Sequence, residues 1–553
     1  MKVTGHVGDA VLAAARAYGV DEVFTLSGAH IFPLYDACQK AGVRLLDVRH
    51  EQTAAFAAEA MAKLTRRPGL CGLTAGPGVT NGMSAITTAM FNGSPLVVIG
   101  GRAGEGRWGS GSLQEIDHLP FVAPLVKDAR TVRSAGSAAA DVTAAIEAAL
   151  TPHRGPVFVD VPIDVVFSPS EADVADPGAA FLPEAAEPDG DLVARAAGLL
   201  AGAERPAIVA GSDVYWEGAW DALRRCAEAL RIPVFVNGLG RGCIPADHEL
   251  AFARTRGLLK QADVVVVIGT PLDFRVSFGN FGEAALVHVT DGPGARTGLA
   301  DPAVAIQGDL RAVLDGWASW DGPGHRNDHA DWIRKLADEE AARRAGEDAE
   351  LTGGGGAGGP GGGGSGGAIH PARVYGELRK VLDRDAIVVC DGGDFVSYAG
   401  KYIESYHPGC WLDTGPYGCL GTGPGYSMAA RVAYPDRQVV ALLGDGAFGF
   451  SGIDWESLAR QNLPVVGVVG NNGIWGLEYH PMESIYGYQV AAELTPGLRY
   501  DDVVKALGGA GETVTDAGEI GPALRRAFAA GVPYLVNVIT DPAVAYPRSS
   551  SLV

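Results

Sequence analysis

Two short motifs, each directly after an apolar run, carry oxygen atoms suited to a metal ion. Asp445 lies in the motif GDG (residues 444–446), and Asn472 ends the run LPVVGVVGNN (residues 463–472). The spacing of Asp445 and Asn472 fits one strand–helix–strand crossover, which brings both strand ends to the same edge of a parallel sheet. Carboxylate and amide oxygens suit Mg²⁺ or Ca²⁺, and such an ion can hold a diphosphate. Each motif alone is more often only a turn.

Taken together, GDG and NN resemble the cofactor motif of thiamine diphosphate (ThDP) enzymes. The resemblance implies that the side chains of Asp445 and Asn472 and the carbonyl of Ile474 hold Mg²⁺. Backbone N–H groups at Gly446 and Ala447 would face the diphosphate. Further cofactor contacts are expected from Asp394 and Phe395. We expect Asn471 to brace the turn.

A second requirement of that family is a glutamate that contacts the aminopyrimidine ring, normally from a partner subunit. The segment RHEQTAAFAAEAMA (residues 49–62) resembles the family's segment, and Glu51 takes that role. Without the metal motif, Glu51 would be interpreted as a carboxylate stabilised by the dipole at a helix N-terminus. The segment LDTGPYGCLGTGPGYSMAA (residues 412–430) resembles the one that bends the cofactor. Leu420 would be the apolar wedge between its two rings, although it could equally be a core leucine, and the Gly418 carbonyl would accept from the 4′-amino group.

The residues that follow the GDG and NN motifs favour acyl-CoA chemistry. The run AFGFSG (residues 447–452) and the continuation NNGIW are similar to those of oxalyl-CoA decarboxylase and 2-hydroxyacyl-CoA lyase. Leu113 and Gln114 replace a Tyr-Glu pair typical of the decarboxylase, which favours the lyase. The expected reaction is reversible cleavage of a 2-hydroxyacyl-CoA, with 2-hydroxyisobutyryl-CoA giving acetone and formyl-CoA. The alternatives are oxalyl-CoA decarboxylase and acetolactate synthase.

Such a reaction needs a base near the substrate hydroxyl. Glu493 follows VAA and precedes LTPG, so we expect burial to raise its pKa into a useful range, with Gln114 as a hydrogen-bonding partner. A solvated carboxylate is the equally weighted alternative. For the CoA substrate the resemblance implies contacts from Lys401, Leu113 and Arg548, the last in a tail that closes over the groove.

The elements that must position these residues are those of an α/β protein with three parallel sheets, the fold of ThDP-dependent decarboxylases and acetolactate synthase. Short apolar runs alternate with helical stretches along the chain. The first twenty residues are predicted to form a helix. We expect a pyrimidine-binding domain at residues 1–170, a middle domain at 190–345, a Gly-rich linker at 351–368, a diphosphate-binding domain at 369–545 and a tail at 546–553. The middle domain resembles ones that bind ADP or FAD, so a nucleotide there is a further expectation.

Charge and composition limit the partners. The net charge of −21 makes nucleic acid an unexpected partner, and no apolar run is long enough to span a membrane. Seven widely spaced cysteines without a CxxC motif suit a reducing cytoplasm and argue against a zinc site. The resemblance implies a homodimer or homotetramer whose active site is shared between subunits.

Overall fold

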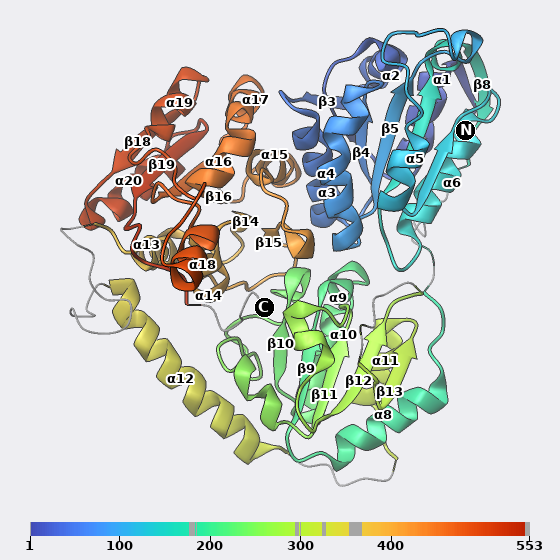
Figure 1. The fold of residues 1–553 in the computed structure, drawn as a ribbon. Helices are drawn as coiled ribbons and strands as arrows, with labels where there is room; N and C mark the ends of the chain where they lie inside the picture. The colour runs from blue at the N-terminus through green and yellow to red at the C-terminus, as the bar shows by residue number, and fades with distance from the viewer. Residues whose placement is uncertain are drawn as a thin grey trace.

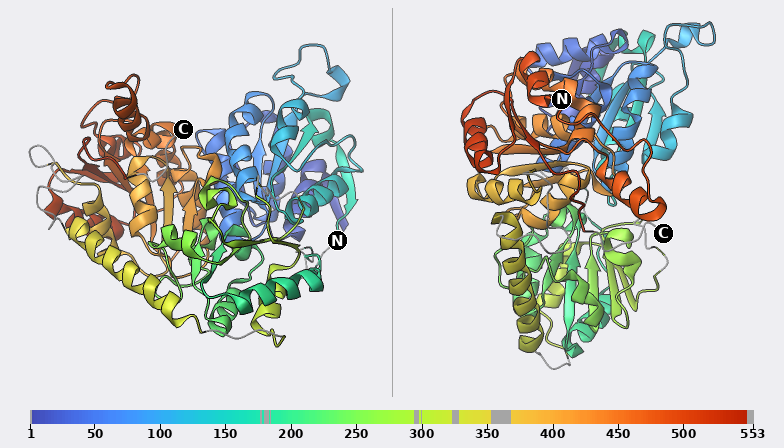
Figure 2. Two further views of the ribbon diagram at one scale, coloured as in Figure 1. Left: turned by 60° about the horizontal axis from the view of Figure 1, so that its bottom comes forward. Right: turned by 60° about the vertical axis from the view of Figure 1, so that its left-hand side comes forward.

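A computed structural model describes residues 2–175, 185–293, 300–322, 328–352 and 368–547, together with Gly178, Pro183 and Gly298. Three parallel sheets dominate the described chain, as predicted. Figure 1 shows the N-terminal domain in blue to cyan, the C-terminal domain in orange to red, and the middle domain in green to yellow. In both views of Figure 2 the middle domain lies beneath the other two.

The N-terminal domain is built on six parallel strands. Their order is β3 (Arg44–Asp47), β2 (Glu22–Thr25), β4 (Gly69–Leu73), β5 (Leu96–Arg102), β7 (Val157–Pro162) and β6 (Asp128–Thr131). The main helices around them are α1 (Val7–Ala17), α2 (Phe32–Ala41), α3 (Glu51–Thr65), α4 (Pro77–Asn92) and α6 (Ala138–Leu150). The central strands are buried along their whole length, which explains their unbroken apolar runs.

Five parallel strands form the sheet of the middle domain. Their order is β10 (Val234–Val236), β9 (Pro206–Ala210), β11 (Val264–Ile268), β12 (Ala285–Thr290) and β13 (Val304–Gln307). The helices of this part are α8 (Gly190–Gly202), α9 (Ser212–Trp216), α10 (Trp220–Leu230), α11 (Leu310–Ala318) and α12 (Ala330–Thr352). The long helix α12 runs along the outer side of the middle domain towards the C-terminal domain (Figure 1).

Six parallel strands also form the sheet of the C-terminal domain. Their order is β15 (Trp411–Asp413), β14 (Ile387–Asp391), β16 (Val439–Gly444), β17 (Val466–Asn471), β19 (Tyr534–Ile539) and β18 (Ala510–Val514). The helices are α13 (Ala372–Val381), α14 (Asp394–Tyr402), α15 (Gly423–Ala433), α16 (Asp445–Ser451), α17 (Trp455–Arg460), α18 (Gly476–Tyr486), α19 (Tyr500–Ala506) and α20 (Ile520–Ala529).

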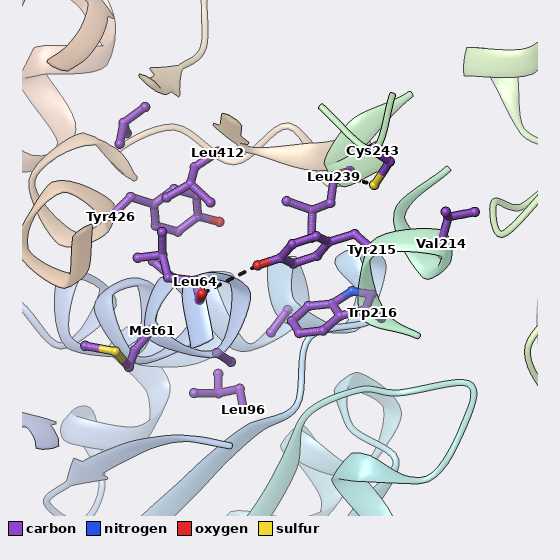
Figure 3. Packing of buried hydrophobic residues seen from close by; sticks show 14 of the residues in the cluster. Met61, Leu64, Leu96, Val214, Tyr215, Trp216, Leu239, Cys243, Leu412 and Tyr426 are labelled. Atoms are coloured by element: carbon purple, nitrogen blue, oxygen red, sulfur yellow. Dashed lines mark hydrogen bonds between the residues drawn. The ribbon is translucent and has the colours of Figure 1, made fainter. Parts of the chain in front are cut away.

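Helix α3 joins the three domains through its C-terminal half. Lys63 is 2% exposed and forms an ion pair with Glu59 (2.9 Å), and both contact the hydroxyl of Tyr426 on α15. From the middle domain, the Tyr215 hydroxyl donates to the Lys63 carbonyl at 2.6 Å. Figure 3 shows Tyr215 pointing towards Leu64 at the end of α3. This buried polar and apolar packing fixes where the strand ends of the N- and C-terminal domains lie relative to each other.

Two local expectations differ from the structure. Residues 2–6 form strand β1 (Lys2–His6), which pairs antiparallel with β8 (Pro169–Asp173), so the first helix begins only at Val7. The alternation in KVTGH is too short to distinguish from the start of a helix without the partner strand. Helix α12 continues to Thr352 and thus enters the segment predicted as linker; residues 353–367 lie outside the described residues. No helix of the described chain has the length and apolar character needed to cross a membrane.

Candidate active site

The two motifs meet at the carboxyl edge of the C-terminal sheet. Strands β16 and β17 are parallel neighbours, with Gly444 opposite Gly470. The Asp445 carboxylate accepts hydrogen bonds from the backbone N–H of Gly446 (2.9 Å) and of Gly473 (2.7 Å). The predicted convergence of the GDG and NN motifs is therefore present in the structure.

Asp445 has the surroundings of a cation ligand. Its side chain is almost fully buried, and burial raises the pKa of the carboxyl to about 6. An ionised carboxylate in such a place is costly unless a positive charge compensates it. The Asn472 side chain is close by, with its Oδ1 accepting from the Ile474 N–H at 3.1 Å.

The first amide of the pair has a structural role. The Asn471 side-chain amide donates to the Leu498 carbonyl (2.9 Å) and to the Asn537 side chain (3.1 Å). These bonds hold the segment after α18 against β19. Asn471 thus bonds Leu498 and Asn537 outside the turn, whereas the neighbouring Asn472 lies at the edge of the cavity; that Asn471 braces the turn stays a prediction.

A cavity of about 590 Å³ opens at this edge. The start of α14, with Gly393 as its N-cap, and the starts of α16 and α18 all border it, so several N–H-bearing helix ends face the same space. Helix N-termini favour anions such as a diphosphate. The cavity brings together most of the residues predicted for the cofactor and metal. These are Asp394, Phe395, Gly418, Leu420, Asp445, Gly446, Ala447, Asn472 and Ile474.

Leu420 is held in this cavity by contacts that the sequence analysis did not anticipate. The buried Asp391 carboxylate accepts from the Gly421 and Gly423 N–H groups, each at 2.8 Å. Gly392 has φ +52°, and a Cβ there would come within 2.0 Å of Leu420 Cδ2. Gly392 must therefore remain a glycine for Leu420 to take this position. The motif DGG (residues 391–393), directly after the strand residues IVVC, is the sequence feature that could have indicated these contacts to Leu420.

The N-terminal domain contributes none of the described residues that line this cavity. Glu51 begins α3, is 8% exposed, and accepts from the Asn81 side chain at 3.0 Å. Leu113 is 77% exposed, and Gln114 has φ +58° beside Gly76. Within one chain, Glu51, Leu113 and Gln114 therefore stand apart from the residues that would hold the cofactor.

The prediction that Glu493 is buried is wrong for this chain. Glu493 is exposed, because the segment after α18 lies on the surface. Its backbone nevertheless pairs with Ile474 in an antiparallel bridge, flanked by hydrogen bonds from Trp475 to Ala492 and from Leu494 to Gly473. Glu493 is thus placed beside the NNGI turn but without the apolar surroundings inferred from its neighbours in sequence.

The residues predicted for CoA do not gather at the main cavity. Lys401 forms an ion pair with Glu350 (3.3 Å), donates to the Tyr402 hydroxyl (2.9 Å), and lines a separate cavity between the middle and C-terminal domains. Arg548 lies outside the described residues. The described end of the tail does reach the main site, since the Tyr546 N–H donates to the Asp394 carboxylate at 3.2 Å.

Arg275 of the middle domain is a site residue that the sequence analysis missed. Phe274 and Arg275 line the main cavity, and Arg275 is the only cationic side chain among its described lining residues. The guanidinium is oriented by the Asp273 carboxylate at 2.7 Å. No motif singled it out, because its approach to the cavity depends on how the middle domain packs.

Comparison with known proteins agrees with this geometry. Residues 5–121 match the N-terminal TPP binding domain of thiamine pyrophosphate enzymes, residues 193–316 the central domain, and residues 391–538 the C-terminal TPP binding domain. The chain is 54% identical to a Mycobacterium tuberculosis protein named acetolactate synthase large subunit IlvG, over 99% of this chain and 98% of the relative. The chain belongs to the thiamine pyrophosphate enzyme family.

More distant members of this family carry another name. The chain is 33% identical to human 2-hydroxyacyl-CoA lyase 2, over 92% of this chain and 84% of the relative. It is 32% identical to the protein of the same name from Caenorhabditis elegans, over 93% and 85%. The chain is thus an enzyme of the thiamine pyrophosphate family, and the relatives named above bear the names of two different reactions.

The described residues of this thiamine pyrophosphate enzyme fit the cofactor. The buried Asp445 carboxylate at the edge of the cavity suits a cation, the helix starts suit a diphosphate, and Leu420 lines a cavity large enough for a cofactor. When bound, thiamine pyrophosphate supplies the electron sink that accepts the electrons of a broken carbon–carbon bond. The protein's part is to bind and orient the reactants and to move protons.

Proposed function

We propose that the chain condenses two 2-oxo acids with loss of carbon dioxide, the reaction of an acetolactate synthase. The observation that carries this proposal is the 54% identity to proteins of that name along 99% of the chain. This replaces the lyase expected from short motifs, because the lyase relatives reach only about 33%. The motifs AFGFSG and NNGIW cover a few residues and outweigh neither the length nor the level of that identity.

A 2-oxo acid carries a carboxylate that needs a cation. Arg275 lines the cavity, and because its Nε and Nη2 already bond the Asp273 carboxylate, its Nη1 is the nitrogen left to bind and orient the substrate carboxylate. For two molecules of pyruvate, one carboxylate leaves as carbon dioxide. The remaining two-carbon unit forms a bond to the keto carbon of the second pyruvate, whose oxygen takes a proton, giving acetolactate. We propose that Arg275 holds the second carboxylate while that bond forms.

The second candidate is a 2-hydroxyacyl-CoA lyase. Support comes from the relatives of that name and from the Lys401 cavity, which adjoins the main cavity at Gly400 and could accept part of a long substrate. In that case Glu493, beside the NNGI turn, would be the base at the hydroxyl. Glu493→Gln should then slow cleavage at least tenfold, and an unchanged rate would exclude Glu493 as the base.

A direct assay separates the candidates. The purified protein with thiamine pyrophosphate and Mg²⁺ is tested with pyruvate, oxalyl-CoA and 2-hydroxyisobutyryl-CoA, with Asp445→Asn as the inactive control. Acetolactate formation from pyruvate, with a raised KM in Arg275→Met, is the expected result. Formation of acetone and formyl-CoA without acetolactate would replace the proposal with the lyase. An ADP or FAD in the middle domain stays a prediction.

We further propose that the working site contains two copies of the chain. Glu51 is buried within its own domain and absent from the described lining of the cavity, so a second copy is needed to bring a glutamate to it. Large apolar side chains near the site are exposed in the single chain, as at an unformed interface. They include Phe450 and Ile453, and Leu113 is a further exposed apolar side chain, in the N-terminal domain.

Complementation tests the shared site. Co-expressed Glu51→Gln and Asp445→Asn chains should form mixed dimers in which one of the two sites has both native residues. We expect activity in the mixture although each variant alone is inactive. If both residues served the same chain's cofactor, the mixture would stay as inactive as its components.

A further inference from the structure

The cavity lined by Lys401 has a volume of about 190 Å³ and lies between the middle and C-terminal domains; we call it the arginine cavity from here on. Its lining is rich in cations, namely Arg241, Arg254, Arg256, Arg344 and Lys401. Three of them, Arg254, Arg344 and Lys401, form ion pairs with the carboxylates of Glu340, Glu347, Glu350 and Glu404. Arg241 and Arg256 form no ion pair with any described residue.

Of these two arginines, Arg256 has the fewer hydrogen-bond partners. No ion pair or hydrogen bond joins its guanidinium to any described residue, and its Nη2 is buried without an acceptor. Burial lowers the pKa of Arg256, and the nearby Arg275 lowers it further, against the attraction of Asp273. A guanidinium nitrogen that is buried without an acceptor is costly, which favours an anion as its partner.

Two further arginines face the same cavity with unused donors. Arg254 bonds Glu347 at 2.6 Å through Nε, yet its Nη2 is buried without an acceptor. Arg241 donates to the Gly400 and Ile403 carbonyls and lies over the Trp411 ring, yet its Nε is also buried without one. These three buried N–H-bearing atoms call for an anion with several acceptor oxygens.

We propose that the arginine cavity binds a phosphate-type oxyanion through Arg256, Arg254 and Arg241. The geometry suits phosphate because planar guanidinium groups match its oxygens. The volume exceeds that of a water many times and is smaller than a typical organic-ligand site. The anion is either free inorganic phosphate or a phosphate group on a larger ligand that enters by the adjoining main cavity. The inference does not depend on which reaction the enzyme catalyses.

The test is thermal stability of the full-length protein in sodium phosphate against sodium chloride of equal ionic strength. We expect phosphate to raise the Tm of the wild type by roughly 2–5 °C near saturation. Arg256→Met should lose this increase, and its Tm without phosphate should be no lower than that of the wild type, because a guanidinium with a buried Nη2 that lacks an acceptor is removed. Arg225→Met is the matched control, since Arg225 is exposed in the same domain and pairs with Asp315.

Equal phosphate-dependent shifts in the wild type and Arg256→Met, or no shift in the wild type, would overturn the proposal. If Arg256→Met fails to fold, Arg256→Lys and equilibrium dialysis of labelled phosphate against the wild type provide the readout, with weaker binding expected for the lysine variant. Adenosine 3′,5′-bisphosphate distinguishes the two sources. Binding at least tenfold tighter than phosphate identifies a phosphate carried by a larger ligand, and similar affinities identify the free anion.

Discussion

Asp445→Asn should stabilise the protein without its cofactor and destabilise it with the cofactor. The carboxyl of Asp445 has its pKa raised by burial from 3.8 to about 6. This difference corresponds to about 3 kcal/mol of cost for keeping the carboxylate ionised at neutral pH. The value is an upper bound on the gain from asparagine, because the Gly446 and Gly473 N–H groups then lose part of their acceptor.

The direction in which the stability changes with pH follows from proton linkage. Between about pH 4 and pH 6 the native state binds a proton at Asp445 that the unfolded chain has released, so stability from this group falls as the pH rises through about 6. Below pH 4 both states are protonated. Asp445→Asn should therefore exceed the wild type in stability at pH 7.5, and the difference should close as the pH falls from 6 to 4.

Denaturant midpoints from pH 4 to pH 8, with and without Mg²⁺ and thiamine pyrophosphate, provide the assay. Adding both should stabilise the wild type and leave Asp445→Asn unchanged, so that the order of stability reverses. Asp454→Asn is the control: Asp454 is also fully buried with a raised pKa but bonds Arg49 and Thr53, and it should keep its Mg²⁺ response. A Mg²⁺-dependent increase in Asp445→Asn equal to that of the wild type would refute the reasoning.

Three other changes test separate contacts. Glu51→Gln should reduce kcat by at least ~100-fold while leaving the Tm unchanged, since it removes a proton-transfer group; a drop below tenfold would contradict its role. Lys63→Met should lower the free energy of unfolding by roughly 3–5 kcal/mol in urea, because it leaves the buried Glu59 uncompensated. The double variant Lys63→Met with Glu59→Gln should recover part of this loss. If the losses of the two single variants simply added in the double variant, the interpretation would be contradicted. Deletion of residues 546–553 removes the Tyr546 contact to Asp394 and should raise the substrate KM, whereas an unchanged KM would show that the tail is not a lid.

Much of the fold was readable from local patterns. The central strands of the three sheets correspond to apolar runs, because parallel strands buried on both faces need such runs. The edge strands β6 (DART) and β18 (AGETV) are half-buried and polar, so no apolar run indicates them. The convergence of Asp445 and Asn472 was also predictable, since neighbouring parallel strands end at one edge. Burial of Glu493 was not, because neighbours in sequence do not reveal whether a segment packs inward.

The sequence by itself determined the three-sheet fold, the pairing of the GDG and NN motifs and the membership of the family to which they belong. Only the tertiary structure decided that Asp391 and Gly392 position Leu420, that Arg275 reaches the main cavity, and that the Nη2 of Arg256 is buried without an acceptor. The physical reason is the same in each case. Strand formation and motif spacing depend on nearby residues, whereas a compensated charge or a close approach depends on segments that meet only when the domains pack.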